Sequence, residues 1–133
     1  LQRHFLDFSA IVHHEDNVTC PADMAHLLFQ IERGAREDVR TLVAARLCRQ
    51  MIDIMLGQTD KEGIPSGVRG VPVANKTGAI SYVRNDVAIV SPFGDSPFVL
   101  AICTKDLRDY AGAYEGMRRL ARTVYERVRG TNL

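Results

Sequence analysis

The residues with the clearest chemical potential are Lys76, Thr77 and Gly78, followed by Ala79, within a run of strand-forming residues. Such a strand would present an ammonium group, a hydroxyl group, a glycine that lets a ligand approach the main chain, and then a backbone N–H. An anionic substrate and its developing oxyanion could be held by such a set. Three residues alone are a weak signal, because short motifs match by chance and often have only a structural role. The interpretation therefore depends on the surrounding sequence.

The composition is that of a globular domain with one core. The 133 residues are 46% hydrophobic and 25% charged, and 17 basic against 16 acidic residues leave a net charge of +1. So small a net charge gives little support to nucleic-acid binding. No uncharged apolar run approaches the ~20 residues of a membrane-spanning helix. The chain begins at Leu1 without an initiator Met or signal-peptide features, so we expect it to be part of a longer protein.

Hydrophobic periodicity predicts three main helices. The first covers residues 21–34 and ends at Gly34, where a left-handed residue is usual. The second is longer, opens at residues 37–38 and ends at residue 57. The third follows Asp106, and we expect it to cover a sheet. The stretch 1–18 mixes apolar and charged residues, which predicts a short helix or a packed loop.

Three strand-like runs lie between the second and third helices. They cover residues 71–80, 86–91 and 98–104, and a loop without a period of its own precedes them over residues 59–72. The short connections between the runs imply an antiparallel meander. The predicted fold is therefore α/β of the α+β type, with two helices, a three-stranded antiparallel sheet and a C-terminal helix packed on it. Three strands leave at least one unpaired edge.

The context of the Lys-Thr-Gly triplet resembles one protein family. The segments that carry the resemblance are NVTCPADMA (17–25), IPSGV (64–68), PVANKTGA (72–79), VRNDVAIV (83–90) and FVLAICTK (98–105). Together with the long final helix they resemble the C-terminal part of class A β-lactamases and related penicillin-recognising serine hydrolases. The resemblance covers essentially the whole chain and about the second half of the family's fold. It implies one partial domain over residues 1–133, with a β-lactamase/transpeptidase-like fold.

The family's signature is only partly present. It comprises S-x-x-K, S-D-N and K-T-G, and the Ser of the first motif is the nucleophile. No serine of this chain has Lys three positions on, and no Ser-x-Asn or Tyr-x-Asn occurs. The family's deacylating Glu lies in an E-x-x-x-N segment, whereas this chain offers only Glu15-Asp16-Asn17. We therefore expect that even a complete parent protein deacylates poorly and behaves more like a penicillin-binding protein or an inert relative of the family.

The resemblance implies roles for individual residues. Lys76 and Ala79 take the catalytic roles, the first as a positive charge and the second as one N–H donor of the oxyanion hole. Thr77 and Gly78 bind substrate, with the hydroxyl of Thr77 on a carboxylate. Arg84 falls where many class A enzymes place an arginine that binds the same carboxylate, which a guanidinium can do with two hydrogen bonds. The alternative for Arg84 is a solvated strand arginine, and the sequence leaves both open.

A run of potential metal ligands occurs at His13-His14-Glu15-Asp16. Adjacent residues project in different directions, and no further ligand can be placed from the sequence, so a solvated loop is the expected structure. We predict no metal and no cofactor.

The three cysteines are Cys20, Cys48 and Cys103, without metal-like spacing. Buried free thiols are the expected state. Cys20 alone has a reason to be reactive, because it falls at the start of a predicted helix.

Two functions of different classes follow. In the first, the chain is the C-terminal segment of a β-lactamase-like serine hydrolase, which acts on a β-lactam or a peptidoglycan-like amide through a serine supplied by a missing N-terminal half. The chain alone would hold charge but form no acyl intermediate. In the second, it is a non-catalytic binding or assembly module that closes its sheet edge on a partner chain or by self-association. The family works outside the bacterial cytoplasm, which implies a periplasmic or secreted location.

Overall fold

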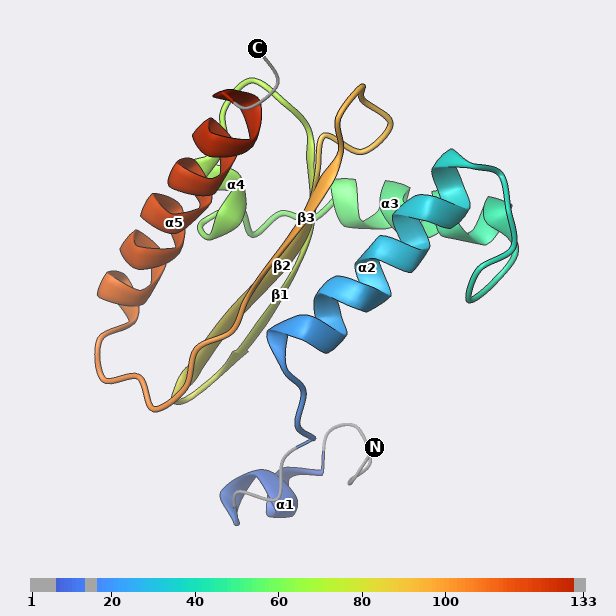
Figure 1. Ribbon diagram of the computed structural model, residues 1–133. Coiled ribbons are helices and arrows are strands. Elements are labelled where there is room, and N and C mark those ends of the chain that lie inside the picture. Colours follow the sequence, from blue (N-terminus) through green and yellow to red (C-terminus); the bar gives the residue numbers. More distant parts are fainter. Residues whose placement is uncertain (1–6, 14–16, 131–133) are drawn as a thin grey trace.

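A computed structural model describes residues 7–13 and 17–130. Its helices and strands, in chain order, are α1 (Phe8–Val12), α2 (Pro21–Arg36), α3 (Ala45–Leu56), α4 (Ile64–Gly67), β1 (Val73–Ile80), β2 (Val83–Val90), β3 (Phe98–Ile102) and α5 (Tyr110–Gly130). They form three layers: α2 and α3 cover one face of the sheet, and α4 and α5 cover the other (Figure 1). The predicted fold class is confirmed. Within the described residues, no helix is both long and apolar enough to cross a membrane.

The sheet is an antiparallel meander in the order β1-β2-β3. A tight hairpin joins β1 to β2, with Ile80 paired to Val83. The second strand was predicted to begin at Asp86, but it begins at Val83 and therefore includes Arg84 and Asn85. Pairing with β1 overrides the low strand preference of these polar residues.

Apolar side chains fill the space on both faces of the sheet. On the first face, Ala74, Val87 and Ile89 pack with apolar residues of α2 and α3. On the second face, Val73, Ala88 and Val90 pack with apolar residues of α4 and α5. Because side chains alternate along a strand, even-numbered residues of β1 and odd-numbered residues of β2 face α2 and α3. This alternation fixes the direction of every side chain in the candidate site.

The first predicted helix was expected to end at Gly34, and this is wrong. α2 continues to Arg36, and Gly34 is buried where α2 meets the following loop and α3. A Cβ at Gly34 would lie 2.7 Å from both Cys48 Sγ and Thr41 Oγ1. The glycine therefore allows α2 to pack closely against α3 and the loop before it, and it does not mark the end of the helix.

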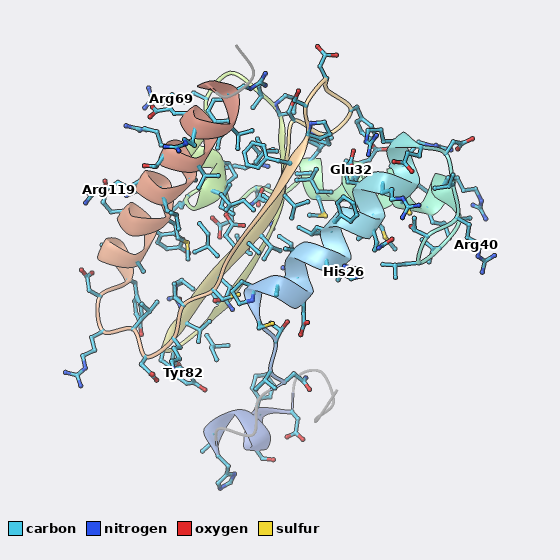
Figure 2. The ribbon with its side chains drawn as sticks, viewed as in Figure 1. His26, Glu32, Arg40, Arg69, Tyr82 and Arg119 are labelled. Atoms are coloured by element: carbon cyan, nitrogen blue, oxygen red, sulfur yellow. The ribbon has the colours of Figure 1, made fainter. Side chains whose placement is uncertain are left out.

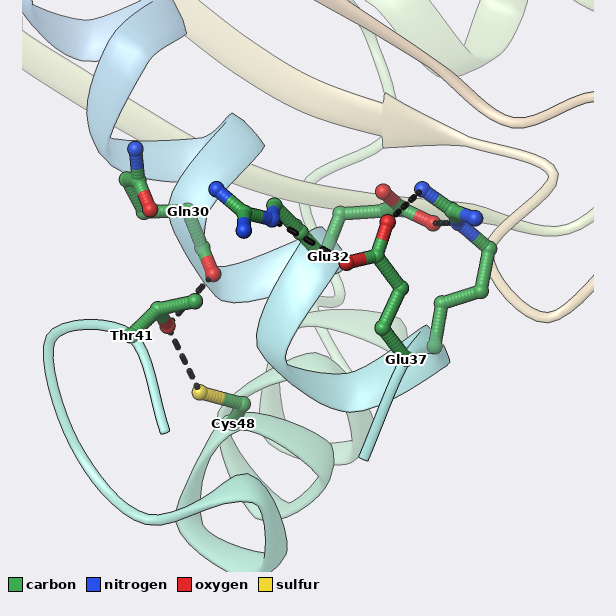
Figure 3. Close-up of polar contacts among 7 residues, drawn as sticks. Gln30, Glu32, Glu37, Thr41 and Cys48 are labelled. Atoms are coloured by element: carbon green, nitrogen blue, oxygen red, sulfur yellow. Dashed lines mark hydrogen bonds and ion pairs between the residues drawn. The ribbon is translucent and has the colours of Figure 1, made fainter. Parts of the chain in front are cut away.

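The second helix was predicted to open at residue 37, whereas α3 begins at Ala45. Asp38 has a φ of 54°, a left-handed conformation that no helix can continue through. The loop that results is held by side chains: Thr41 Oγ1 donates to Gln30 O at 2.8 Å (Figure 3), and Arg49 Nη1 donates to Asp38 Oδ1 at 2.8 Å. The predicted end of this helix at Gly57 is confirmed.

Two smaller differences concern the connections. The segment predicted to be a loop over residues 59–72 contains the short helix α4, whose Ile64 and Gly67 are buried. The N-terminal stretch contains α1, in agreement with a short helix, although part of the stretch lies outside the described residues. Exposed arginines such as Arg40 before α3 and Arg119 on α5 point away from the sheet (Figure 2).

Candidate functional site

The Lys-Thr-Gly triplet lies in the second half of β1. One edge of β1 pairs with β2, and among the described residues no strand pairs with its outer edge. Lys76, Gly78 and Ala79 are exposed, and Thr77 is half-buried. Lys76 Nζ donates to the carbonyl oxygen of Thr77 at 2.5 Å. The ammonium group therefore lies against the strand's own backbone, at a surface that solvent reaches.

The outer edge of β1 presents the backbone groups of alternate residues. In an antiparallel pair, residues whose N–H and C=O bond to the partner alternate with residues whose groups point away. Ser91 N donates to Pro72 O at 2.8 Å, which fixes the phase of this alternation. The backbone groups of residues 74, 76 and 78 therefore bond to β2. The backbone groups of residues 73, 75, 77 and 79 point away from β2, toward the open edge. Lys61 Nζ donates to Val73 O at 3.3 Å from outside the sheet, which agrees with an outward-pointing carbonyl at residue 73. The N–H of Ala79 thus faces the open edge.

The register also fixes which side chains share a face of the sheet. Lys76 lies on the same face as Ala74, toward α2 and α3, whereas Thr77 lies on the face toward α4 and α5. Arg84 is paired with Ala79 and shares the face of Thr77. The side chains of Lys76 and Arg84 therefore leave opposite faces of the sheet.

Arg84 is half-buried and bound within the chain. Its Nη1 donates to Ile80 O at 2.5 Å and to Val83 O at 2.7 Å. Its guanidinium carbon lies 4.2 Å from the centre of the Tyr110 ring, a cation–π distance. The guanidinium thus binds the hairpin and the start of α5, and its role toward a substrate stays a prediction.

Gly78 has room for a side chain within this chain. A Cβ there would have Asn85 Cβ as its nearest heavy atom, at 3.8 Å, which is an ordinary contact. The packing of the described residues therefore gives no reason for glycine at this position. A ligand or further polypeptide that approaches the strand would give one.

A buried polar network supports β1 just before the triplet, and the sequence interpretation missed it. Asn75 and Asp86 are 0% and 1% exposed. Asn75 Nδ2 donates to Asp86 Oδ1 at 3.1 Å and to Asp60 O at 3.1 Å, and Lys61 Nζ donates to Asn75 Oδ1 at 3.0 Å. Asp86 Oδ2 accepts from the backbone N–H of Ile64 at 2.8 Å. A lone carboxylate in the otherwise apolar run DVAIV was the signal that could have revealed it.

Burial raises the pKa of Asp86 to about 6, and the negative charge of Asp60 raises it further. The N–H of Ile64, the amide of Asn75 and the charge of Lys61 act in the opposite direction. Gly63 permits this contact, since a Cβ there would lie 2.4 Å from Asp86 Oδ2. The network joins the segment 60–64 to the strand that carries Lys76.

The potential metal ligands give no site in the described part of the chain, which holds no group of three or more candidate ligands. His13 Nδ1 lies 2.8 Å from Ser9 O, one turn earlier in the chain. The rest of that motif, residues 14–16, lies outside the described residues.

All three cysteines are free thiols. Cys48 is buried as predicted and Cys103 is half-buried, but Cys20 is exposed, so the expectation of three buried thiols is wrong for Cys20. It precedes α2 as the N-cap residue and makes no side-chain capping bond.

Comparison with known proteins identifies the family. The model of the β-lactamase enzyme family matches residues 1–128. The chain therefore belongs to that family, and the resemblance noted in the sequence is confirmed. No curated protein matches the chain.

Solved structures agree with this assignment. PBP-A is 28% identical with a TM-score of 0.72, over 84% of this chain and 40% of its own. A mutant of PBP-A, solved as an acyl-enzyme complex with penicillin G, is 27% identical with a TM-score of 0.68, over 84% of this chain and 40% of its own. A β-lactamase from Xanthomonas campestris pv. campestris is 25% identical with a TM-score of 0.69, over 81% of this chain and 40% of its own. This chain thus spans about 40% of the length of these structures.

Proposed function

We propose that this chain supplies one wall of a serine acyl-transfer site in a β-lactamase-like hydrolase. The substrate class is a β-lactam or a related peptidoglycan-like amide. The observation that carries the proposal is the open outer edge of β1, where the exposed Lys76 and the outward N–H of Ala79 lie three residues apart on one strand.

Each residue of the strand has a defined task in this proposal. The ammonium of Lys76 attracts the anionic substrate, and the hydroxyl of Thr77 donates a hydrogen bond to its carboxylate. Gly78 leaves room for the substrate beside the main chain, and the N–H of Ala79 stabilises the negative charge that develops on the attacked carbonyl oxygen. Arg84 lies on the face of Thr77, opposite that of Lys76, and in this proposal its guanidinium turns from the hairpin carbonyls to the carboxylate that Thr77 binds.

The nucleophile must come from another stretch of polypeptide, because this sequence contains no S-x-x-K. Its serine would attack the amide carbonyl, form the acyl-enzyme and release the amine, and water would then hydrolyse the ester. The penicillin G acyl-enzyme of the PBP-A mutant supports acyl transfer as the reaction type. In this proposal residues 1–133 are the C-terminal half of one domain, and the partner is an N-terminal half. An extracytoplasmic location is the corresponding inference from the family.

A fusion protein tests the proposal. The part of PBP-A that this chain does not match would be joined to residues 1–133 and incubated with a fluorescent penicillin, with the 133-residue chain alone in parallel. The proposal predicts covalent label on the fusion and none on the chain. Label on the isolated chain, or a folded fusion that stays unlabelled, would contradict it.

The unpaired edge of β3 favours a second candidate, a non-catalytic assembly module. Within the described residues β3 pairs only with β2, and all five of its residues are half-buried. Such an edge can add a strand from another chain. A purified chain that forms a defined dimer and whose fusion takes no label would favour this candidate over the hydrolase.

A further inference from the structure

Cys20 and Cys103 flank two elements that pack against each other. Cys20 directly precedes α2, and Cys103 directly follows β3. α2 lies along β3 (Figure 1), and Met24 from its first turn packs in the same apolar cluster as Val99 and Ala101. The two cysteines, far apart in the sequence, are therefore adjacent to one helix–strand contact.

The positions of both residues point to the same end of that contact. Met24 N donates to Cys20 O at 3.2 Å, so Cys20 lies one helical turn before Met24. Cys103 lies two residues beyond Ala101, on the side of the strand that faces α2. The extended path continues there, because Thr104 Oγ1 accepts from Arg84 N at 2.9 Å and Thr104 N donates to Asn85 Oδ1 at 2.8 Å.

The electrostatics of the two thiols agree with this placement. Burial raises the pKa of the Cys103 thiol, and the charge of a Cys20 thiolate raises it further. This influence agrees with the placement of both thiols beside the contact between α2 and β3. Cys20 is exposed and Cys103 half-buried, so an oxidant reaches Cys20 first.

We propose that Cys20 and Cys103 form a thiol pair that closes to a disulfide and ties the start of α2 to the end of β3. The oxidant is a low-molecular-weight disulfide, such as oxidised glutathione. The Cys20 thiolate attacks one glutathione sulfur, and a mixed disulfide forms as one glutathione thiolate leaves. Cys103 then loses its proton and attacks Cys20 Sγ, which expels the second glutathione. Two protein thiols are oxidised, and one glutathione disulfide is reduced to two thiols.

Thiol counting in the 133-residue chain tests this proposal. Dilute reduced protein would be incubated with oxidised glutathione, then denatured, and its free thiols titrated and its peptides mapped by mass spectrometry. The free thiols should fall from three to one, with Cys20 linked to Cys103. Three remaining thiols, stable glutathione adducts without ring closure, or a Cys20 link between two chains would overturn the proposal.

Matched variants separate the pair from the third cysteine. Cys48→Ala removes the buried thiol and should leave formation of the disulfide intact. The number of free thiols in this variant should therefore fall from two to none. Cys20→Ser replaces the N-cap by a preferred capping residue, so the fold should persist. In that variant Cys103 and Cys48 should both remain reduced. Oxidation of Cys103 to a link with Cys48 in the Cys20→Ser variant would contradict the assigned pairing.

Discussion

Asn75 on β1 and Asp86 on β2 are joined by a buried hydrogen bond of 3.1 Å, although the strand register pairs Asp86 with Thr77 and not with Asn75. The bond runs diagonally across the two strands and ends one residue before Lys76. Because Asp86 also accepts from Ile64 N, one carboxylate connects the central strand, the edge strand and the first residue of α4. The strand that carries the candidate site is thus held in part by a titratable group, the carboxylate of Asp86.

The pH dependence of stability should report the ionisation of Asp86. Its folded pKa of about 6 lies above the unfolded value of 3.8, so the folded state holds the proton more tightly. This contribution to the free energy of unfolding is fully present below about pH 4 and is lost as the pH rises through about 6. The difference between the folded and unfolded pKa values of Asp86 corresponds to about 3 kcal/mol. Urea denaturation of the chain between these pH values measures it.

The control for this prediction is a pair of carboxylate variants. Asp86→Asn keeps an acceptor for Ile64 N but does not titrate, so the decline in stability over this pH range should disappear. Asp53→Asn, on the exposed side of α3, should retain the decline. An unchanged pH profile in Asp86→Asn would refute the role of Asp86.

A side chain at residue 63 should disturb the same network. In Gly63→Ala the new Cβ would lie 2.4 Å from Asp86 Oδ2, and the neighbouring strand cannot move without breaking its pairing. We expect a loss of about 1–3 kcal/mol in the free energy of unfolding, as for overpacked core positions. Gly116→Ala on α5 meets open space and should stabilise the helix by about 1 kcal/mol. Equal stability of the two variants would argue against a close contact at residue 63.

Removal of the Lys61 charge should shift the titration of Asp86. The charge of Lys61 lowers the pKa of Asp86, and its ammonium bonds to Asn75 Oδ1 at 3.0 Å. In Lys61→Met the pKa of Asp86 should therefore rise above 6, which carboxyl NMR can follow directly. Lys105→Met, an exposed lysine after β3, should leave that titration in place. A lowered pKa in Lys61→Met would show that the network is arranged differently.

Arg84 and Tyr110 should be energetically coupled. Their contact at 4.2 Å predicts a coupling energy of about 0.5–2 kcal/mol in a double-mutant cycle of Arg84→Met and Tyr110→Leu. Tyr110 Oη also donates to Ser81 O, so Tyr110→Phe, which keeps the ring, separates the two contributions. Additive effects of Arg84→Met and Tyr110→Leu would exclude the stacked arrangement.

Local patterns predicted most of the fold. The alternating apolar residues of the three strands and the long stripe of α5 are periodic signals, and the structure follows them. The errors occur where a tertiary contact overrides a local preference. Gly34 was interpreted as a helix end because glycine often has that role, but here it lies against Cys48 and Thr41. The segment 37–44 has helical spacing, but Asp38 adopts a left-handed conformation and Thr41 bonds back to α2.

The candidate site was predictable only for residues within one strand. Lys76, Thr77, Gly78 and Ala79 are contiguous, so their order along an edge strand follows from the sequence. The network of Lys61, Asn75 and Asp86 was missed because it depends on the pairing of segments 11 to 22 residues apart. The guanidinium contacts of Arg84 likewise depend on a hairpin whose register the sequence leaves open.

The contribution of Lys76 to acylation tests the central claim most directly. In the fusion with the unmatched part of PBP-A, the rate of labelling by a fluorescent penicillin would be compared for the unchanged sequence, Lys76→Ala and Lys105→Ala. Loss of an electrostatic contact in the site predicts a decrease of about 10²–10³-fold for Lys76→Ala and no change for Lys105→Ala. Labelling of Lys76→Ala at the unchanged rate would contradict the assignment of the Lys-Thr-Gly strand to the site.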